Sequence, residues 1–268
     1  MATEFGTIGE DTITTGSGND VIYGGPTTAE DPLDLGDLLQ GRGGDDSIFG
    51  GGGDDVLRGN GGDDYLHGGI GNDKLTGASG DDSLFGGDGA DSLFGGGGTD
   101  TLYGGPGDDF LDGDGGSDTV YGGGGNDTVK GDGGGSFFDW LYGGSGDDVV
   151  DDSSGDSELY GGSGADTLYG GGGNDSYFGG LGDDFLVVGS SSSSDVETFV
   201  FTVGDGNDTI DGFDAGQDIV DLSALNLAGF GDIAFSSTTD GVLASVADIS
   251  IEFLDLTLAD ITSGDFII

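Results

Sequence analysis

The chain has 268 residues, and 66 glycines and 53 acidic residues against 4 Lys and Arg give it a formal net charge of −49. Such self-repulsion predicts disorder unless a counter-ion neutralises it, yet 33% of the residues are hydrophobic and 9% aromatic. Both facts agree if a cation is part of the fold. The negative charge excludes nucleic acids and anionic membrane surfaces as partners, because both recruit basic patches.

The sequence shows no recognisable secretory signal or membrane span and contains no cysteine. The N-terminal segment MATEFGTIGE has neither the basic region nor the apolar region of a cleaved secretory signal. No stretch approaches the ~20 apolar residues of a membrane span, so we expect no membrane span. The chain has no cysteine, which excludes disulfides and thiolate metal sites.

A nine-residue repeat begins near the N-terminus with GTIGEDTIT and TGSGNDVIY. Residues 26–40 (PTTAEDPLDLGDLLQ) then interrupt the series as a predicted loop. Contiguous repeats run from Gly41 to Lys130, for example GGDGADSLF and GGGGTDTLY. A second interruption over residues 131–142 (GDGGGSFFDWLY) precedes further repeats from Gly143 to Val187.

The positions of the repeat have separate physical roles. Glycine at positions 1, 2 and 4 permits positive φ and close backbone approach, and aspartate at position 6 offers a hard oxygen ligand. Position 8 is Ile, Leu or Val in nearly every repeat, which predicts a very short strand at positions 7 to 9 with one inward side chain. One repeat cannot bury its single leucine alone, but stacked repeats can, as in a solenoid. The in-register aspartates favour Ca²⁺, which takes 6–8 oxygens, over the stricter Mg²⁺.

The repeat resembles G-G-x-G-x-D-x-U-x, the calcium-binding nonapeptide of RTX (repeats-in-toxin) proteins. The resemblance covers residues 6–187 and implies an all-β fold, a parallel β-roll (right-handed β-solenoid) in which two repeats make one coil, with a C-terminal β cap. It also implies Ca²⁺, on the order of fifteen ions, between turns of neighbouring coils. The ligands it implies are carbonyls of the glycine turns and position-6 carboxylates, with two fitted after insertions (Asp37, Asp139): Asp11, Asp20, Asp37, Asp46, Asp55, Asp64, Asp73, Asp82, Asp91, Asp100, Asp109, Asp118, Asp127, Asp139, Asp148, Asp166, Asp175 and Asp184.

Some repeats depart from this pattern. Ser157 replaces the aspartate in DSSGDSELY, which puts a calcium ion at that turn in doubt, and Tyr177 replaces the aliphatic residue of position 8 in GGGGNDSYF. Acidic residues at position 5, such as Asp45, Asp54 and Asp63, are expected to be solvated rather than ligating.

After residue 187 the composition shifts, so we divide the chain into residues 1–187, the calcium-binding roll, and residues 188–268. The segment FVFTVGDGNDTIDGFDAGQDIVDLSAL resembles the C-terminal region of RTX proteins exported by type I systems, and places Asp208 and Asp218 as the last calcium-turn residues. The terminal SGDFII resembles the uncleaved export signal. A second interpretation is a β cap over the last coil, which solenoids require, and both can hold.

Position 9 predicts two different faces. Alternate repeats lie on one sheet, which gives an aromatic ladder: Tyr23, Phe49, His67, Phe85, Tyr103, Tyr121, Tyr142, Tyr160 and Phe178. The other sheet presents Arg58, Thr76, Phe94, Asp112, Lys130, Asp151, Tyr169 and Val187. Either the rings only stack on one another, or they form an interface for self-association or for a polysaccharide.

The pattern indicates no catalytic group, because the only histidine is His67 and the repeat already accounts for the paired carboxylates. We therefore expect no enzyme. Three functions stay open: a secreted structural, matrix or surface protein, the folding and export module of a larger extracellular enzyme, and a ligand-binding adhesin. Repeats that begin just after Met1 favour the first. The expected location is extracellular or at the cell surface, reached by type I export.

Overall fold

The computed structural model of the chain describes residues 1–6, 11–25, 35–131, 134–135, 137–189 and 194–268. It contains two compact units, Met1–Gly133 and Gly134–Ile268. Strands dominate both units, and the three described helices are single turns of 3₁₀ helix in the second unit. The all-β fold expected from the repeat is therefore confirmed.

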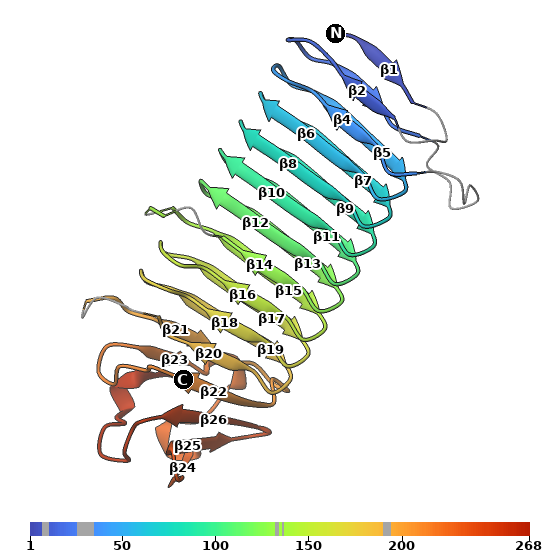
Figure 1. The fold of residues 1–268 in the computed structure, drawn as a ribbon. Helices are drawn as coiled ribbons and strands as arrows, with labels where there is room; N and C mark the ends of the chain where they lie inside the picture. Colours follow the sequence, from blue (N-terminus) through green and yellow to red (C-terminus); the bar gives the residue numbers. More distant parts are fainter. Residues whose placement is uncertain (7–10, 26–34, 132–133, 136, 190–193) are drawn as a thin grey trace. The chain divides into compact units, whose positions relative to one another are not determined.

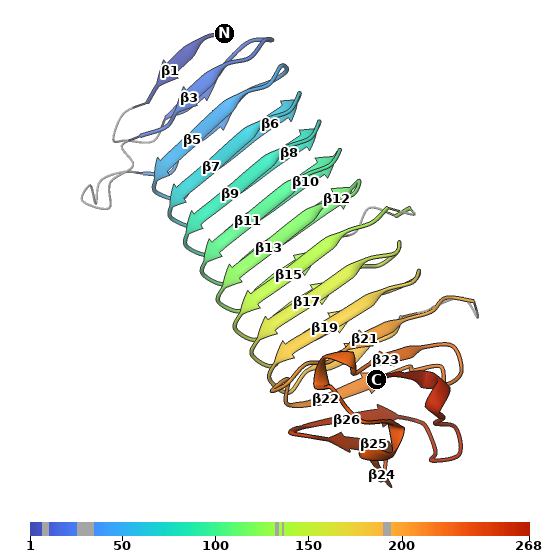
Figure 2. The same cartoon turned by 180° about the vertical axis from the view of Figure 1, so that it is seen from behind.

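The described residues of the first unit form fourteen short strands, most of them six residues long. They are β1 (Thr3–Phe5), β2 (Thr12–Thr14), β3 (Val21–Tyr23), β4 (Leu38–Gln40), β5 (Ser47–Gly52), β6 (Val56–Gly61), β7 (Tyr65–Ile70), β8 (Lys74–Ser79), β9 (Ser83–Asp88), β10 (Ser92–Gly97), β11 (Thr101–Pro106), β12 (Phe110–Gly115), β13 (Thr119–Gly124) and β14 (Thr128–Lys130). In this unit the odd-numbered strands form one parallel sheet and the even-numbered strands a second one (Figures 1 and 2).

The pairing register of this unit advances by two repeats. Leu84 of β9 pairs with Leu102 of β11, and Leu75 of β8 pairs with Leu93 of β10. Each coil therefore contains two repeats and contributes one strand to each sheet, which confirms the parallel β-roll. The side chains of position 8 point between the sheets and are completely buried: Ile22, Leu39, Ile48, Leu57, Leu66, Leu75, Leu84, Leu93, Leu102, Leu111, Val120 and Val129.

From β5 to β13 the strands are longer than the three residues predicted, whereas β2, β3, β4 and β14 have that length. In β5 and β7 pairing continues past position 9 into the next repeat, where Gly51 pairs with Gly69 and Gly52 with Ile70. Positive φ occurs at positions 2 and 4, for example 111° at Gly51 and 95° at Gly53. The glycine at position 1 serves another purpose, because a Cβ on Gly50 would lie 2.2 Å from a carboxylate oxygen of Asp55.

The first interruption is shorter than predicted. Residues 26–34 of the predicted loop lie outside the described residues. Leu38–Gln40, which we assigned to the same loop, instead form β4 and pair in parallel with β2 and β6. The chain rejoins the roll here because Leu39 supplies a position-8 side chain with no exposed surface.

The second unit also begins with stacked repeats. Its strands are β15 (Trp140–Ser145), β16 (Val149–Asp151), β17 (Glu158–Ser163), β18 (Thr167–Tyr169), β19 (Ser176–Leu181), β20 (Phe185–Val187), β21 (Thr198–Val200), β22 (Asn207–Asp211), β23 (Ile219–Asp221), β24 (Ala234–Ser237), β25 (Gly241–Val246), β26 (Ile249–Leu254) and β27 (Phe266–Ile267). Its 3₁₀ turns are η1 (Ser223–Leu225), η2 (Phe230–Asp232) and η3 (Ser263–Asp265). The second interruption accordingly ends before residue 140, where β15 begins.

Parallel pairing in this unit continues past residue 187, because β19 pairs with β21 and β20 with β22. Among its described strands, the antiparallel pairs are β24 with β25 and β25 with β26. Tyr177 occupies position 8 of its repeat, is completely buried and stacks on Phe199 with ring centroids 4.7 Å apart. The division at residue 187 stays a prediction.

Candidate metal centre

The aspartates of position 6 lie inside the turns and connect successive coils. In the first unit, the backbone N–H of Asp82 donates to Oδ1 of Asp100 at 2.7 Å, and the N–H of Asp100 donates to Oδ1 of Asp118 at 2.8 Å. The same bond joins the members of two stacks. One stack contains Asp20, Asp46, Asp64, Asp82, Asp100 and Asp118, and the other contains Asp11, Asp37, Asp55, Asp73, Asp91, Asp109 and Asp127.

In many of these carboxylates the second oxygen is buried and has no donor. Oδ2 lacks a hydrogen-bond partner in Asp46, Asp64, Asp73, Asp82, Asp91, Asp100 and Asp109 of the first unit and in Asp166, Asp184 and Asp208 of the second. A Cβ on Gly95 would lie 2.5 Å from Oδ2 of Asp100 and 2.8 Å from the carbonyl oxygen of Gly113, one coil further on. A carboxylate oxygen and a backbone carbonyl therefore face the same small space, which suits a cation that prefers oxygen ligands.

The electrostatics of the turns also favour a cation. Burial raises the pKa of Asp64, Asp73 and Asp100 to about 7, and the charges of neighbouring carboxylates add to the rise. A buried carboxylate must be protonated, paired or metal-bound. The repeats contain too few lysines and arginines for pairing, which leaves protons or metal ions.

The described residues contain no group of three or more His, Cys, Asp or Glu side chains arranged to hold a metal ion. A metal site built from side chains alone is therefore not present among them. The ligand set implied by the repeat combines carboxylates with carbonyls of the glycine turns, and the orphaned Oδ2 atoms facing carbonyls fit that set. The residues present thus fit Ca²⁺.

In the second unit two stacks continue the pattern. One stack contains Asp148, Asp166, Asp184 and Asp208, so Asp208 occupies the position expected for it. The other contains Asp139, Ser157, Asp175, Glu197 and Asp218. Glu197 was not predicted, yet it is 1% exposed and its Oε2 accepts the N–H of Asp175 at 2.8 Å. The signal was the spacing of Glu197 and the buried Phe199, which matches that of positions 6 and 8. An insertion hides this signal, because the unbroken nine-residue count from Asp184 reaches Ser193 instead of Glu197.

Position 5 has a role that the sequence did not reveal. Asp45, Asp54 and Asp63 are exposed, as expected of solvated residues. Their Oδ1 atoms also accept the backbone N–H of position 5 one coil later, with N–O distances of 3.1, 2.8 and 2.9 Å respectively. The position-5 side chain therefore accepts a backbone N–H from the next coil along the sequence, whereas the position-6 side chain accepts one from the preceding coil.

The aromatic ladder predicted at position 9 is present within each unit. Ring centroids are 4.9 Å apart between Phe85 and Tyr103 and 4.8 Å between Tyr103 and Tyr121. In the second unit Tyr160 stacks on both Tyr142 and Phe178, at 4.5 and 4.3 Å. The insertion keeps the register, because Tyr23 stacks on Phe49, and Phe5 adds a further rung that was not predicted.

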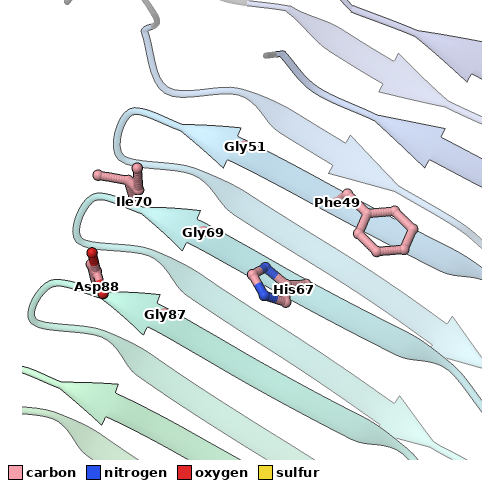
Figure 3. A pocket seen from close by; sticks show the side chains of 7 residues that line it. All are labelled: Phe49, Gly51, His67, Gly69, Ile70, Gly87 and Asp88. Carbon is pink, nitrogen blue, oxygen red and sulfur yellow. The ribbon is translucent and has the colours of Figure 1, made fainter. Parts of the chain in front are cut away.

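His67 lies in the ladder beside a hollow of about 450 Å³, with its ring 6.5 Å from that of Phe49 and 6.2 Å from that of Phe85. Figure 3 shows the rings of Phe49 and His67 on neighbouring strands, while Ile70 and Asp88 lie at the strand ends beside the turns. Tyr65 adds a second ring next to these residues, 5.6 Å from Phe49 and 5.2 Å from Phe85. His67 is thus one rung in an aromatic row.

A family model of known calcium-binding repeats matches the chain along much of its length. The family model of the RTX calcium-binding nonapeptide repeat (4 copies) matches residues 5–26, 34–66, 67–102, 94–129, 103–137, 134–151, 151–186 and 200–224. No curated protein matches the chain. Among solved structures, the crystal structure of the extracellular lipase LipA from Serratia marcescens is similar at 19% identity and a TM-score of 0.38, over 83% of this chain and 40% of the lipase chain.

The family match covers most of the chain, and its ranges include the repeats that form both pairs of stacks. None of the described helices has the length and apolar character needed to cross a bilayer. RTX repeat proteins are typically secreted, and the buried repeat aspartates fit the calcium binding that the repeats imply. The chain belongs to the RTX calcium-binding nonapeptide repeat family, and its repeats indicate a secreted calcium-binding β-roll protein.

Proposed function

We propose that this chain is an extracellular structural or surface protein whose roll folds only when Ca²⁺ binds. Its ions would be held by the position-6 carboxylates, together with Glu197 in the second unit, and by carbonyls of the glycine turns. The observation that carries the proposal is the row of buried Oδ2 atoms without a donor. Ca²⁺ would supply the positive charge that these oxygens lack and would bridge successive turns.

The free energy of the metal-free fold gives the physical reason. Each buried, ionised carboxylate without a partner costs several kcal/mol, and each turn adds another. Binding of Ca²⁺ to the folded state alone converts binding free energy into folding free energy. The chain would stay unfolded in a calcium-poor cytosol, in a form competent for export, and fold outside at millimolar Ca²⁺.

Circular dichroism of the full chain during a calcium titration tests this proposal. At pH 8 we expect the repeats to lose their strand signal in excess chelator and to regain it at millimolar Ca²⁺, with Mg²⁺ much less effective. An undiminished strand spectrum at pH 8 after complete calcium removal would refute calcium-coupled folding.

Asp100→Asn tests the assignment of ligands. It keeps the oxygen that accepts the N–H of Asp82 but removes the charge, so it should lower the number of bound ions and raise the calcium midpoint of folding. Asp88→Asn removes an equal charge from an exposed position and is the matched control. Equal calcium binding by both variants would contradict the ligand role of position 6.

We also propose that the aromatic ladder mediates self-association in Ca²⁺. The stacked rings cover one another's faces but leave their edges accessible: Tyr103 is 39% exposed and Tyr23 36%. The same position on the other sheet of the first unit carries Arg58, Thr76, Phe94, Asp112 and Lys130 in register. A contact through the aromatic face would leave this more polar face toward water.

Replacing Phe85, Tyr103 and Tyr121 together with serine should abolish assembly in sedimentation velocity while calcium binding persists. Serine at Thr76, Phe94 and Asp112, the same position on the other sheet, is the control and should not change assembly. A ladder variant that sediments like the parent protein excludes self-association through this face. Loss of polysaccharide binding by that variant would instead support the alternative of a polysaccharide-binding adhesin.

For residues 188–268 we propose a double role, as the cap of the roll and as the region read by a type I export system. Asp265 supports the first role, because its Oδ1 accepts the N–H of Gly216 at 2.8 Å and it is 1% exposed. Deletion of residues 265–268 should block secretion in a type I host, and normal secretion would refute the export role. The alternative, that the chain is the folding module of a larger extracellular enzyme, predicts a heavier native protein by mass spectrometry.

A further inference from the structure

One repeat of the second unit differs from the others at two positions at once. In DSSGDSELY, Asp152 occupies position 1, where regular repeats have glycine, and Ser157 occupies position 6, where they have aspartate. Position 4 of the turn is regular, because Gly155 has a φ of 120° and its N–H donates to the carbonyl of Gly172 at 2.8 Å. The carboxylate and the small residue have therefore exchanged places in a turn that keeps this bond.

Positions 1 and 6 of one repeat meet in space. A Cβ on Gly143 would lie 2.6 Å from Oδ2 of Asp148, and a Cβ on Gly161 would lie 2.5 Å from Oδ2 of Asp166. A side chain that begins at position 1 thus enters the space that Oδ2 of position 6 normally fills. By this geometry Asp152 would have room there, because Ser157 has no carboxylate to occupy the space.

The two residues divide the roles of a regular aspartate between them. The Oγ of Ser157 accepts the N–H of Asp139 at 3.2 Å, which is the coil-to-coil bond that Oδ1 makes in other repeats. The N–H of Ser157 donates to Oδ1 of Asp175 at 2.9 Å, so the stack continues through this turn. Serine therefore preserves the hydrogen bond but contributes no charge.

Asp152 restores that charge to the interior. It has no exposed surface, and its N–H donates to the carbonyl of Tyr169 at 2.8 Å, which fixes its backbone beside β18. Its carboxylate also acts on the next turn of the stack: burial raises the pKa of Asp175 to about 8, and the charges of Glu197 and Asp152 add to the rise. The turn thus carries a buried negative charge, as its neighbours do.

We propose that Asp152 supplies a calcium-ligand carboxylate to the turn formed by residues 152–157, in place of the position-6 aspartate that other repeats have. This turn lacks the position-6 aspartate, but with Asp152 as a ligand it takes part in calcium binding like its neighbours. The inference rests on the proposed calcium-coupled folding and assigns a ligand at position 1 of the repeat, a position that does not normally carry one.

The test exchanges the two residues and counts ions. Asp152→Gly removes the carboxylate and should bind at least one Ca²⁺ fewer per chain than the parent, measured by equilibrium dialysis and elemental analysis. The double variant Asp152→Gly/Ser157→Asp moves the carboxylate to its regular position and should recover the parent's ion count. Ser157→Asp alone places two carboxylates in one space and should raise the calcium midpoint of folding.

A further variant separates loss of the charge from loss of the fold. Asp152→Asn keeps the size of the side chain, so it tests the charge alone if Asp152→Gly does not fold. Equal ion counts for the parent and Asp152→Asn, or a double variant that does not recover the count, would overturn the inference. A parent protein that binds no calcium at all would instead refute the proposed function itself.

Discussion

Residues 35–131 of the first unit and residues 206–268 of the second solve the problem of buried acids in different ways. In the first region each position-6 aspartate has one oxygen bonded to a neighbouring coil, and in Asp64, Asp82 and Asp100 the other oxygen has no donor. In the second region Asp218 and Asp265 accept backbone N–H groups on both oxygens, at 2.6–3.1 Å. The first arrangement offers acceptor oxygens to a cation, and Asp208 at the start of the second region still follows it. Asp218 and Asp265, by contrast, are satisfied within the protein.

The two regions also differ in the size of the side chains that form their apolar cores. Residues 35–131 bury one aliphatic side chain per repeat. Residues 206–268 bury several aromatic rings in mutual contact, with Phe213 and Phe253 at 5.0 Å and Phe253 and Phe266 at 6.4 Å. Larger buried side chains contribute more hydrophobic stabilisation. We infer that the repeats depend on metal for their stability, while the C-terminal region supplies more of its own.

Removal of calcium from the full chain tests this difference most severely. In excess chelator the amides of β7, β9 and β11 should exchange with solvent at the rate of an unfolded chain, because nothing neutralises their turns. The amides of β25 and β26 should keep measurable protection. Hydrogen exchange followed by mass spectrometry measures both regions in one sample, and equal exchange in the two regions would eliminate the proposed difference.

Leu102→Asp should have the next largest effect. Leu102 lies between Leu84 and Val120 in the core and has no exposed surface, so a carboxylate there costs several kcal/mol. The calcium midpoint of folding should rise strongly. Thr101→Asp, on the outward face of the same strand, adds the same charge without burying it and is the control. A smaller effect at Leu102 than at Thr101 would reverse the assignment of inside and outside.

These two regions also differ in how far the sequence predicts them. The nine-residue period determines the parallel register, the buried leucines and the two acid stacks, because every repeat must satisfy the same local geometry. The period fails where a different residue takes over the same role, since Glu197 replaces an aspartate and Asp152 exchanges places with Ser157. Only the three-dimensional structure shows that side chains at positions 1 and 6 would occupy the same space, or that the side chain of position 5 accepts a backbone N–H of the next coil.

Without calcium, protonation of the buried aspartates should provide part of the stabilisation that Ca²⁺ would otherwise give. Burial raises the pKa of Asp82 and Asp91 to about 6 and that of Asp100 to about 7, all above the ordinary value of 3.8. The folded roll therefore binds more protons than the unfolded chain between about pH 4 and pH 7. In chelator, its stability should rise as the pH falls through this window and disappear as the pH rises through 7.

With calcium present the dependence has the opposite sign. Protons compete with Ca²⁺ for the same oxygens, so the calcium midpoint of folding should increase as the pH falls below 7. Circular dichroism at pH 5 and pH 8, with chelator and with Ca²⁺, checks both statements. A metal-free chain that is more folded at pH 8 than at pH 5 would show that the buried carboxylates do not limit its stability.

The smallest effect should come from the forward-reaching side chains of position 5. Oδ1 of Asp81 accepts the N–H of Thr99 at 2.8 Å, so Asp81→Ala should cost about 1 kcal/mol, the net value of such a bond. That corresponds to a melting temperature lower by about 2–4 °C in a protein of this size. Asp81→Asn keeps the acceptor oxygen, and asparagine already makes the same bond at Asn72, whose side-chain oxygen accepts the N–H of Ala90 at 2.8 Å. The asparagine variant should therefore have the same melting temperature as the parent in Ca²⁺.

In chelator the asparagine variant should be slightly more stable than the parent, because the charge of Asp81 contributes to raising the pKa of the buried Asp82 and Asp100. If asparagine destabilises the calcium-loaded protein as much as alanine does, the charge of position 5 matters rather than its hydrogen bond, and these residues take part in holding the ions.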